Sequence, residues 1–329
     1  MSDATLIQAE SIQCLFSQRR GPIDLVRGNK STIHAVDTVS FTLKEGEILS
    51  LVGESGCGKS TVGRLLMKLE EPTDGTLSFL GEDVTSISGD DLKKFRRNAQ
   101  IIFQNPFEAF DPRLTVGSSL HQVLRIHGET DEKKRHDKIV QVMERSGLNP
   151  VEDFLARYPH QLSGGQSQRI ATVRAMLLSP RFLVADEPVS MLDVSVRADI
   201  LNQLLDLRDE DNMGIVFITH DLAVARYIAD RIAVMYLGMF VEVGDAEEIV
   251  ANPRHPYSKA LLSNTLPAGD DDRLLEPMTI GGEVPTPVNV KPGCRFASRC
   301  PFAFDRCFSE TPELKPRGGN TDVACHLYE

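Results

Sequence analysis

A glycine-rich stretch from Leu49 to Thr61 constrains the fold of this chain more than any other part of the sequence. A short apolar run ends there in a loop that fits the pattern G-x-x-x-x-G-K-S/T at every fixed position. The glycines let successive backbone N–H groups point at one anion, and the helix expected after them adds the positive end of its dipole. This order of strand, loop and helix favours a phosphate-binding loop in an α/β protein over a glycine-rich turn beside a chance lysine.

The loop therefore predicts a nucleotide site. We expect Lys59 to reach the outer phosphates and Ser60 to ligate Mg²⁺. The residues expected to surround the phosphates are Gly53, Glu54, Ser55, Gly56, Cys57, Gly58, Lys59, Ser60 and Thr61.

Polar side chains follow three further apolar runs that read as buried strands. These are Gln104 after Ile101–Phe103, Asp186 after Phe182–Ala185, and His220 after Ile215–Thr219. In open parallel α/β sheets the ligand lies beyond the carboxyl ends of the strands, so we expect these side chains and the phosphate loop to converge on one crevice. Each residue alone has an ordinary structural reading, but their shared position at strand ends favours one site.

Two adjacent acids, Asp186 and Glu187, suit the chemistry of such a site. The first carboxylate can hold Mg²⁺, usually through water, and the second can orient or deprotonate the attacking water. The alternative is a solvated acidic turn. We assign Glu187, His220 and Gln104 as candidate catalytic residues, and Ser60, Gln104 and Asp186 as candidate Mg²⁺ ligands.

Composition limits the class of protein that can carry this site. The chain has 329 residues, of which 41% are hydrophobic, enough to bury a full core and to form about two or three domains or subdomains. A net charge of -11 argues against a nucleic-acid binder held by bulk electrostatics. The first ten residues do not read as a secretory signal, and no apolar run approaches the roughly eighteen residues that span a bilayer. We expect a cytosolic protein whose membrane role, if any, depends on a partner.

A second helix start, LSGGQ at 162–166, precedes the apolar-faced helix predicted over Ile170–Leu178. Ser163, Gly164 and Gly165 suit a helix N-terminus that binds an anion. Because the chain already has one phosphate loop, this second site would most simply serve the nucleotide of another chain.

The segments GESGCGKST, LSGGQ, FLVADEP and ITHD, with Gln104, resemble the ATP-binding subunits of ATP-binding-cassette (ABC) transporters over residues 5 to 250. The resemblance implies a P-loop NTPase (RecA-like) α/β core with a mixed sheet and an inserted α-helical subdomain at about 106–165. It also implies that the chain hydrolyses ATP with Mg²⁺ in a head-to-tail dimer that sandwiches two ATP molecules. The second ATP-binding subunit would be another copy or a paralogue.

The same resemblance implies roles for individual residues. Gln104 would sense Mg²⁺ and relay its state to the membrane partner, and Phe16 would stack on adenine, with Val36 as a second candidate there. The residues implied to act across the dimer are Ser163, Gly164, Gly165 and Gln166 at the γ-phosphate, and Asp193 in the loop 190–193 that links the two sites.

Two positions depart from the family pattern. Ser167 stands after LSGGQ where a basic residue is more usual, and Met191 replaces a common alanine. Neither residue is expected to touch a phosphate, so we expect fine effects only.

The C-terminal part narrows the resemblance. HPYSKALL, PGCRFASRCPFAFDRC and VACHLYE resemble the C-terminal extension of the ATPases of dipeptide, oligopeptide and nickel importers. This implies a nucleotide-binding domain over 1–252 and a small extension over 253–329. It implies import of a small solute, a peptide in the first place, through two transmembrane permease subunits fed by an extracytoplasmic solute-binding protein. The chain would then be a peripheral subunit at the cytoplasmic face of the inner (plasma) membrane.

Other functions remain open at this point. The same transporter type could carry an oligosaccharide, an opine or nickel. A soluble cassette ATPase acting on DNA or ribosomes would have a long coiled-coil insertion or tandem cassettes, and this sequence has neither. A partner that binds ATP without turnover is disfavoured because Glu187 and His220 are both present.

The segment NPFEAFDPR at 105–113 follows Gln104 and carries two aromatic residues, Phe107 and Phe110, between prolines. A chain gains little from showing aromatics to water, so we expect both rings to line a groove for a cytoplasmic helix of the permease. The alternative is that both pack under the helical subdomain.

Four cysteines lie in the extension, at Cys294, Cys300, Cys307 and Cys325. Their spacing, C-x5-C-x6-C-x17-C, lacks the close cysteine pairs typical of structural zinc sites. Four thiolates from a loop-rich segment suit a 4Fe-4S cluster with a structural role. Zinc, and unligated thiols or disulfides, are the alternatives.

Overall fold

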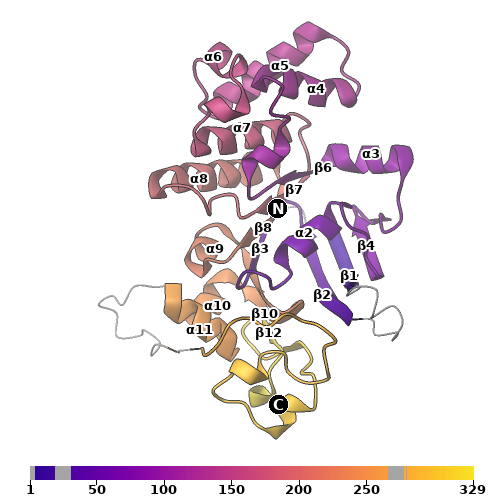
Figure 1. Ribbon diagram of the computed structural model, residues 1–329, viewed down its shortest axis with the longest axis vertical. Coiled ribbons are helices and arrows are strands. Elements are labelled where there is room, and N and C mark those ends of the chain that lie inside the picture. Colours follow the sequence, from indigo (N-terminus) through magenta and orange to yellow (C-terminus); the bar gives the residue numbers. More distant parts are fainter. Residues whose placement is uncertain (1–3, 19–30, 266–277, 279) are drawn as a thin grey trace. The chain divides into compact units, whose positions relative to one another are not determined.

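The computed structural model describes residues 4–18, 31–265, 278 and 280–329 of the chain (Figure 1). The chain forms two compact units. Unit 1 contains residues 45–47 and 87–215, and unit 2 contains residues 4–44, 48–86 and 216–329. No helix in these described ranges is long and apolar enough to cross a membrane.

Unit 2 begins with an antiparallel sheet in the order β2-β1-β4-β5. Its strands are β1 (Thr5–Gln18), β2 (Ser31–Lys44), β4 (Asp74–Phe79) and β5 (Glu82–Asp83). Along β2 the alternate residues Val39, Phe41 and Leu43 are buried while their neighbours face outward. This period of two is the pattern of a strand with one face on a core.

A mixed sheet in unit 2 carries the phosphate loop. The strand order is β11-β12-β10-β9-β3-β8, for β11 (Lys315–Pro316), β12 (Thr321–Val323), β10 (Met239–Asp245), β9 (Arg231–Tyr236), β3 (Ile48–Val52) and β8 (Gly214–Thr219), of which residues 216–219 belong to unit 2. Strand β3 runs parallel to β9, whereas β10 and β12 pair antiparallel. All five residues of β3 are buried, as a central strand covered on both faces requires.

The C-terminal part of unit 2 contains three short 3-10 helices, η3 (Ala297–Arg299), η4 (Asp305–Phe308) and η5 (His326–Tyr328), and four α-helices complete the described residues of the unit. They are α2 (Lys59–Leu66), α9 (Leu222–Ile228), α10 (Ala246–Ala251) and α11 (Pro256–Thr265). Residues of β9, α9, α10 and α11 share one buried apolar cluster with Val52 and Cys57, at the two ends of the turn that leaves β3. Phe296, from the C-terminal part of the chain, belongs to the same cluster. The phosphate loop therefore rests on a core that includes residues from the C-terminal end of the chain.

Unit 1 is mostly helical. Its elements are α3 (Gly89–Asn98), β6 (Ala99–Ile102), η1 (Pro106–Ala109), α4 (Val116–Ile126), α5 (Glu132–Arg145), α6 (Val151–Leu155), η2 (Pro159–Gln161), α7 (Gly164–Met176), β7 (Phe182–Asp186) and α8 (Val194–Asp211). Strands β6 and β7 pair in parallel. Side chains of Thr115, Asp131 and Ser163 cap the starts of α4, α5 and α7, as the sequence predicts for Ser163.

The expectation for the two aromatics after Gln104 is half wrong. Phe107 is 44% exposed, but Phe110 is only 8% exposed and lies in the apolar core of α4, α6 and α7. Both residues belong to the same short turn, η1, which the chain leaves at Phe110 with an extended backbone (φ -126°, ψ 141°), and the ring of Phe110 packs into the core.

Candidate nucleotide site

The phosphate loop joins β3 to α2 and can be made only with glycine at two of its positions. A Cβ atom on Gly53 would lie 2.3 Å from the carbonyl oxygen of Met235, and one on Gly58 would lie 2.1 Å from that of Ala35. Gly58 also has φ 102° as the N-cap of α2, a backbone conformation that favours glycine. The loop therefore packs directly against the backbone of β9 and β2 at these two positions.

Lys59 lies inside this loop. Its ammonium group donates hydrogen bonds to the carbonyl oxygens of Gly53 (2.8 Å) and Glu54 (2.9 Å), and the residue is 5% exposed. Cys57 is buried, and burial raises the pKa of its thiol, so it stays protonated near neutral pH. Ser55, Gly56 and Ser60 face outward, whereas Gly58 and Thr61 are half-buried.

In unit 1 the structure brings Gln104 and Glu187 together. The Gln104 side-chain amide donates a hydrogen bond of 3.1 Å to the Glu187 carboxylate. Asp186, the last residue of β7, is 9% exposed and Glu187 is half-buried. A carboxylate that is held by an amide and still reaches the surface can accept a proton from a bound water.

The LSGGQ segment forms the N-terminus of α7. Ser163 Oγ accepts a hydrogen bond from the backbone N–H of Gln166 at 3.3 Å, and Gln166 Oε1 accepts one from the N–H of Ser163 at 3.1 Å. This reciprocal capping leaves the other first-turn N–H groups for an anion. Gly165 is packed closely, because a Cβ atom there would lie 2.9 Å from the Val196 side chain.

The remaining candidates are placed as follows. His220 is exposed directly after β8, and Asp193 is exposed as the N-cap of α8. Of the two candidates for contact with adenine, Phe16 is 40% exposed on β1, whereas Val36 is fully buried. The two residues that depart from the family pattern differ in setting, since Ser167 is 1% exposed and Met191 is 70% exposed. That the candidates of both units face one nucleotide stays a prediction.

Sequence reasoning missed two residues that contact the phosphate loop. The hydroxyl of Tyr257 accepts a hydrogen bond from the backbone N–H of Glu54 at 2.8 Å. Arg299 forms an ion pair with the Glu54 carboxylate at 2.7 Å. These residues lie 203 and 245 positions from Glu54 in the sequence, and no local pattern connects them.

The four cysteines of the extension are free thiols that lie near one another. Cys307 and Cys325 are buried, Cys294 and Cys300 are half-buried, and the N–H of Cys294 donates to the carbonyl of Cys307 at 2.8 Å. Burial, with smaller contributions from the other three thiols, raises the pKa of Cys294 to about 11. Among the residues that the structure describes, no three His, Cys, Asp or Glu side chains are positioned to hold a metal ion.

Comparison with known families gives two matches. Residues 36–190 match the ABC transporter family, and residues 241–307 match the C-terminal region of oligopeptide/dipeptide transporters. The second match includes Tyr257, Arg299 and three of the four cysteines of the extension.

Relatives and solved structures resemble the chain over most of its length. It is 42% identical to the oligopeptide transport ATP-binding protein AppF of Bacillus subtilis, covering 98% of both chains. It is 47% identical to the dipeptide transport ATP-binding protein DppF of Escherichia coli, covering 89% of this chain and 86% of that one. The dimeric structure of MJ0796, a bacterial ABC transporter cassette, matches 73% of this chain and 99% of its own with 28% identity and a TM-score of 0.65. A second dimeric structure of that cassette, in a post-hydrolysis state bound to ADP and Pi, matches with a TM-score of 0.63 at 28% identity and the same coverage.

Proposed function

This chain belongs to the ATP-binding proteins of oligopeptide and dipeptide ABC transporters, and from that membership we propose that it hydrolyses ATP to drive the import of peptides through a membrane permease. The observation that carries hydrolysis, rather than binding alone, is the Glu187 carboxylate held 3.1 Å from the amide of Gln104 at the end of β7. This arrangement provides a base for the attacking water. A subunit that only binds ATP has no use for it.

We propose the following roles in the reaction. Lys59 exchanges its loop carbonyls for the outer phosphates of ATP, and Glu187 accepts a proton from the attacking water. Ser60 and Asp186 offer the oxygen donors that Mg²⁺ prefers, and the ion would neutralise charge on the β- and γ-phosphates. His220 would stabilise the γ-phosphate and Phe16 would stack on adenine.

The proposed assembly contains two ATP-binding subunits and two permease subunits. The exposed N-terminus of α7, with Ser163 and Gly164, suits contact with the nucleotide of a second copy or a paralogue. We place the chain at the cytoplasmic face of the inner membrane, with an extracytoplasmic solute-binding protein delivering the cargo. We also propose a boundary at residue 252 between the nucleotide-binding domain, with its helical subdomain at about 106–165, and the extension at 253–329.

The test is peptide-dependent ATP hydrolysis by the transporter reconstituted in liposomes with its permease and solute-binding protein. We expect phosphate release to rise with added peptide, and Lys59→Ala to abolish it through weaker nucleotide binding. Parallel assays with nickel, an oligosaccharide and an opine distinguish the alternative cargoes. If ATP hydrolysis responds to nickel, the oligosaccharide or the opine and not to peptides, that solute is the cargo and the proposal of peptide import is wrong.

We further propose that the four cysteines of the extension hold a 4Fe-4S cluster with a structural role. The support is that four cysteines come from separate loop positions of one small extension, where the N–H of Cys294 donates to the carbonyl of Cys307 at 2.8 Å. A single zinc ion needs all four sulfurs about 2.3 Å from one point, whereas a cluster of four irons spreads its thiolates more widely. The spacing of the four cysteines, which lacks the close pairs typical of structural zinc sites, favours the cluster.

Metal content after anaerobic purification tests this proposal. We expect brown protein with about four irons per chain, and loss of colour in Cys307→Ser. Cys14→Ser is the matched control, because Cys14 is also buried but lies on β1. A colourless protein with one zinc ion per chain would show that the cysteines bind zinc and not a cluster. A protein without metal would show that the four cysteines form no metal site.

A further inference from the structure

The extension holds the phosphate loop first through Tyr257, at the start of α11. Its ring is fully buried, and its hydroxyl accepts the backbone N–H of Glu54 at 2.8 Å. Burial raises the pKa of Tyr257, so the hydroxyl stays neutral at any physiological pH. The second residue of the loop is thereby fixed by a side chain from far along the sequence.

The extension also holds the loop through Arg299. Its guanidinium donates two hydrogen bonds to the Glu54 carboxylate, at 2.7 and 3.0 Å, and a third to the carbonyl of Gly281 at 3.2 Å. The Arg299 side chain is 7% exposed and its guanidinium lies over the ring of Tyr236, 5.8 Å from the centroid. This two-pronged pairing fixes both the position and the charge of the carboxylate.

Three polar groups of Glu54 are consequently occupied. Tyr257 holds its N–H, Arg299 holds its carboxylate, and the ammonium of Lys59 donates to its carbonyl. A displacement of Glu54 would therefore also move the lysine that meets the phosphates. An unpaired carboxylate at this position would in addition repel the polyphosphate of ATP.

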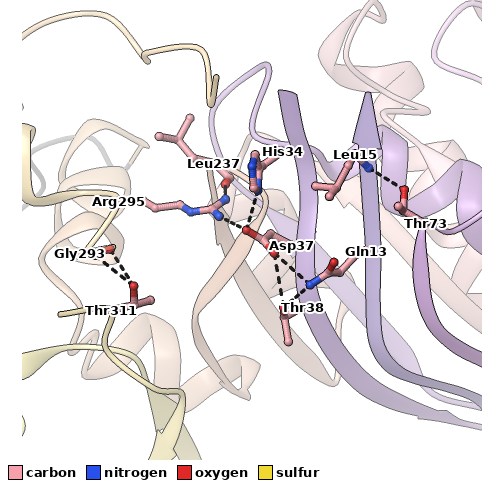
Figure 2. A network of polar contacts seen from close by, with 10 residues as sticks. All are labelled: Gln13, Leu15, His34, Asp37, Thr38, Thr73, Leu237, Gly293, Arg295 and Thr311. Carbon is pink, nitrogen blue, oxygen red and sulfur yellow. Dashed lines mark hydrogen bonds and ion pairs between the residues drawn. The ribbon is translucent and has the colours of Figure 1, made fainter. Parts of the chain in front are cut away.

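The segment that carries Arg299 is itself firmly attached. The rings of Tyr236, Tyr257 and Phe296 contact one another with centroid separations of 4.7, 5.2 and 5.4 Å. Arg295 donates to the Asp37 carboxylate and to the carbonyl of Leu237 (Figure 2).

The Asp37 carboxylate contacts both Arg295 and His34. It lies 3.0 Å from Nδ1 of His34, and both Asp37 and His34 belong to β2 (Figure 2). Burial by itself would raise the pKa of Asp37, but His34 and Arg295 together lower it, so the carboxylate stays charged. Arg299 is therefore presented to the loop from a support that is fixed to β2 and to the end of β9.

We propose that Arg299 and Tyr257 are positioning residues of the nucleotide site, which act through Glu54 to keep the phosphate loop in shape and its charge neutralised. This inference rests on the proposed function. It gives the extension a part in ATP binding that acts through Glu54.

Arg299→Gln is the first test, measured as the dissociation constant of Mg-ATP with the full chain and as the KM and kcat of the assembled transporter. We expect about tenfold weaker binding and a similarly raised KM, with kcat changed much less. The loss of affinity for Mg-ATP should be smaller than for a fully buried ion pair, because the Glu54 side chain is 30% exposed. Arg306→Gln, which removes ion pairs to Glu310 and Glu329 in the same extension, should leave both values unchanged.

The double variant Glu54→Gln with Arg299→Gln separates charge from structure. If Arg299 acts by neutralising Glu54, removing the carboxylate as well should restore most of the lost affinity. A loss that persists in the double variant would overturn the charge role, and unchanged affinity in Arg299→Gln alone would overturn the proposal for Arg299. Mg-ATP binding by the full chain is measured without the permease, so the result stands even if the transporter hydrolyses no ATP.

Tyr257→Phe tests the second contact, because it keeps the ring and removes the hydroxyl. We expect a several-fold rise in KM for ATP with little change in melting temperature. Tyr328→Phe is the matched control, since its hydroxyl donates to the carbonyl of Arg254 at 2.7 Å, away from the loop. Equal effects of the two variants on KM would contradict a role for Tyr257 in positioning.

Discussion

Glu187 has an unusual backbone conformation for a residue with a side chain. Its φ is 46°, and its carbonyl accepts hydrogen bonds from the N–H (3.2 Å) and the hydroxyl (3.0 Å) of Ser190. A left-handed conformation costs on the order of 1–3 kcal/mol at such a residue, so it persists only where the surroundings impose it. The turn directs the carboxylate at the end of β7 toward Gln104.

The first prediction concerns this carboxylate. Glu187→Gln keeps the shape of the side chain and removes the charge that assists the attacking water. We expect ATP binding to persist and phosphate release to fall by about 10² to 10⁴ fold. Glu144→Gln, at an exposed position of α5, is the control. Turnover like that of the wild type would refute the assigned role.

His255 gives a prediction about pH. It is 1% exposed, its Nδ1 accepts the N–H of Tyr257 at 3.1 Å, and burial lowers its pKa to about 3. In the unfolded chain its pKa returns to about 6.5, so below that pH the unfolded state takes up a proton that the folded state does not. Stability is therefore full above about pH 6.5 and falls as the pH drops towards 3.

Urea unfolding at two pH values measures this effect. Between pH 7.5 and 5.5 this histidine should account for a loss of about 1.4 kcal/mol in the free energy of unfolding. His255→Gln should be less stable at pH 7.5 but lose less on acidification, whereas His136→Gln, at a half-buried position of α5, should behave like the wild type. An equal acid loss in all three proteins would show that His255 is not the group responsible.

At the scale of elements, the η1 turn leaves Phe107 exposed and Phe110 buried, although the sequence alone suggests the same role for both rings. Phe110 packs in the core of unit 1, so its replacement by alanine would cost about 3–5 kcal/mol of stability and would not test a surface role. Phe107 is the exposed ring that a permease helix could contact.

We predict that Phe107→Ala leaves folding and ATP hydrolysis of the subunit intact but lowers the amount of peptide transported per ATP. The physical reason is the loss of apolar area at the proposed groove. Transport in liposomes, divided by phosphate release, measures the coupling. Phe302→Ala, an equally exposed ring in the extension, should leave the ratio unchanged. Normal coupling in Phe107→Ala would count against the groove.

At the scale of the whole molecule, the proposed head-to-tail dimer should depend on the N-terminus of α7. In the Glu187→Gln background we predict that ATP, but not ADP, shifts the mass measured by light scattering from one chain to two. Adding Ser163→Ala should weaken this shift, because the hydroxyl would contact the γ-phosphate of the other chain.

The control for this experiment is Thr115→Ala. Thr115 caps α4 as Ser163 caps α7, with a hydrogen bond of 3.2 Å to the N–H of Ser118, so each substitution costs about 1 kcal/mol of helix stability. If both variants weaken dimer formation equally, the effect comes from lost capping and not from contact with ATP.

The sequence by itself determined the local parts of this protein. Fixed spacing in GESGCGKST and LSGGQ predicts the phosphate loop and the capped helix, and apolar runs ended by polar residues predict β6, β7 and β8. These features succeed because each depends on the conformational limits of neighbouring residues, such as the positive φ of Gly58 or the capping hydroxyl of Ser163.

Only the tertiary structure decided which distant side chains support the loop. Tyr257 and Arg299 contact Glu54 although they lie 203 and 245 positions from it in the sequence, and no local sequence pattern indicates these contacts. The burial of Phe110 beside the exposure of Phe107 was likewise settled by packing. The physical reason is that such contacts are chosen by how whole elements pack, and packing energy depends on shape and burial rather than on the local pattern of residues.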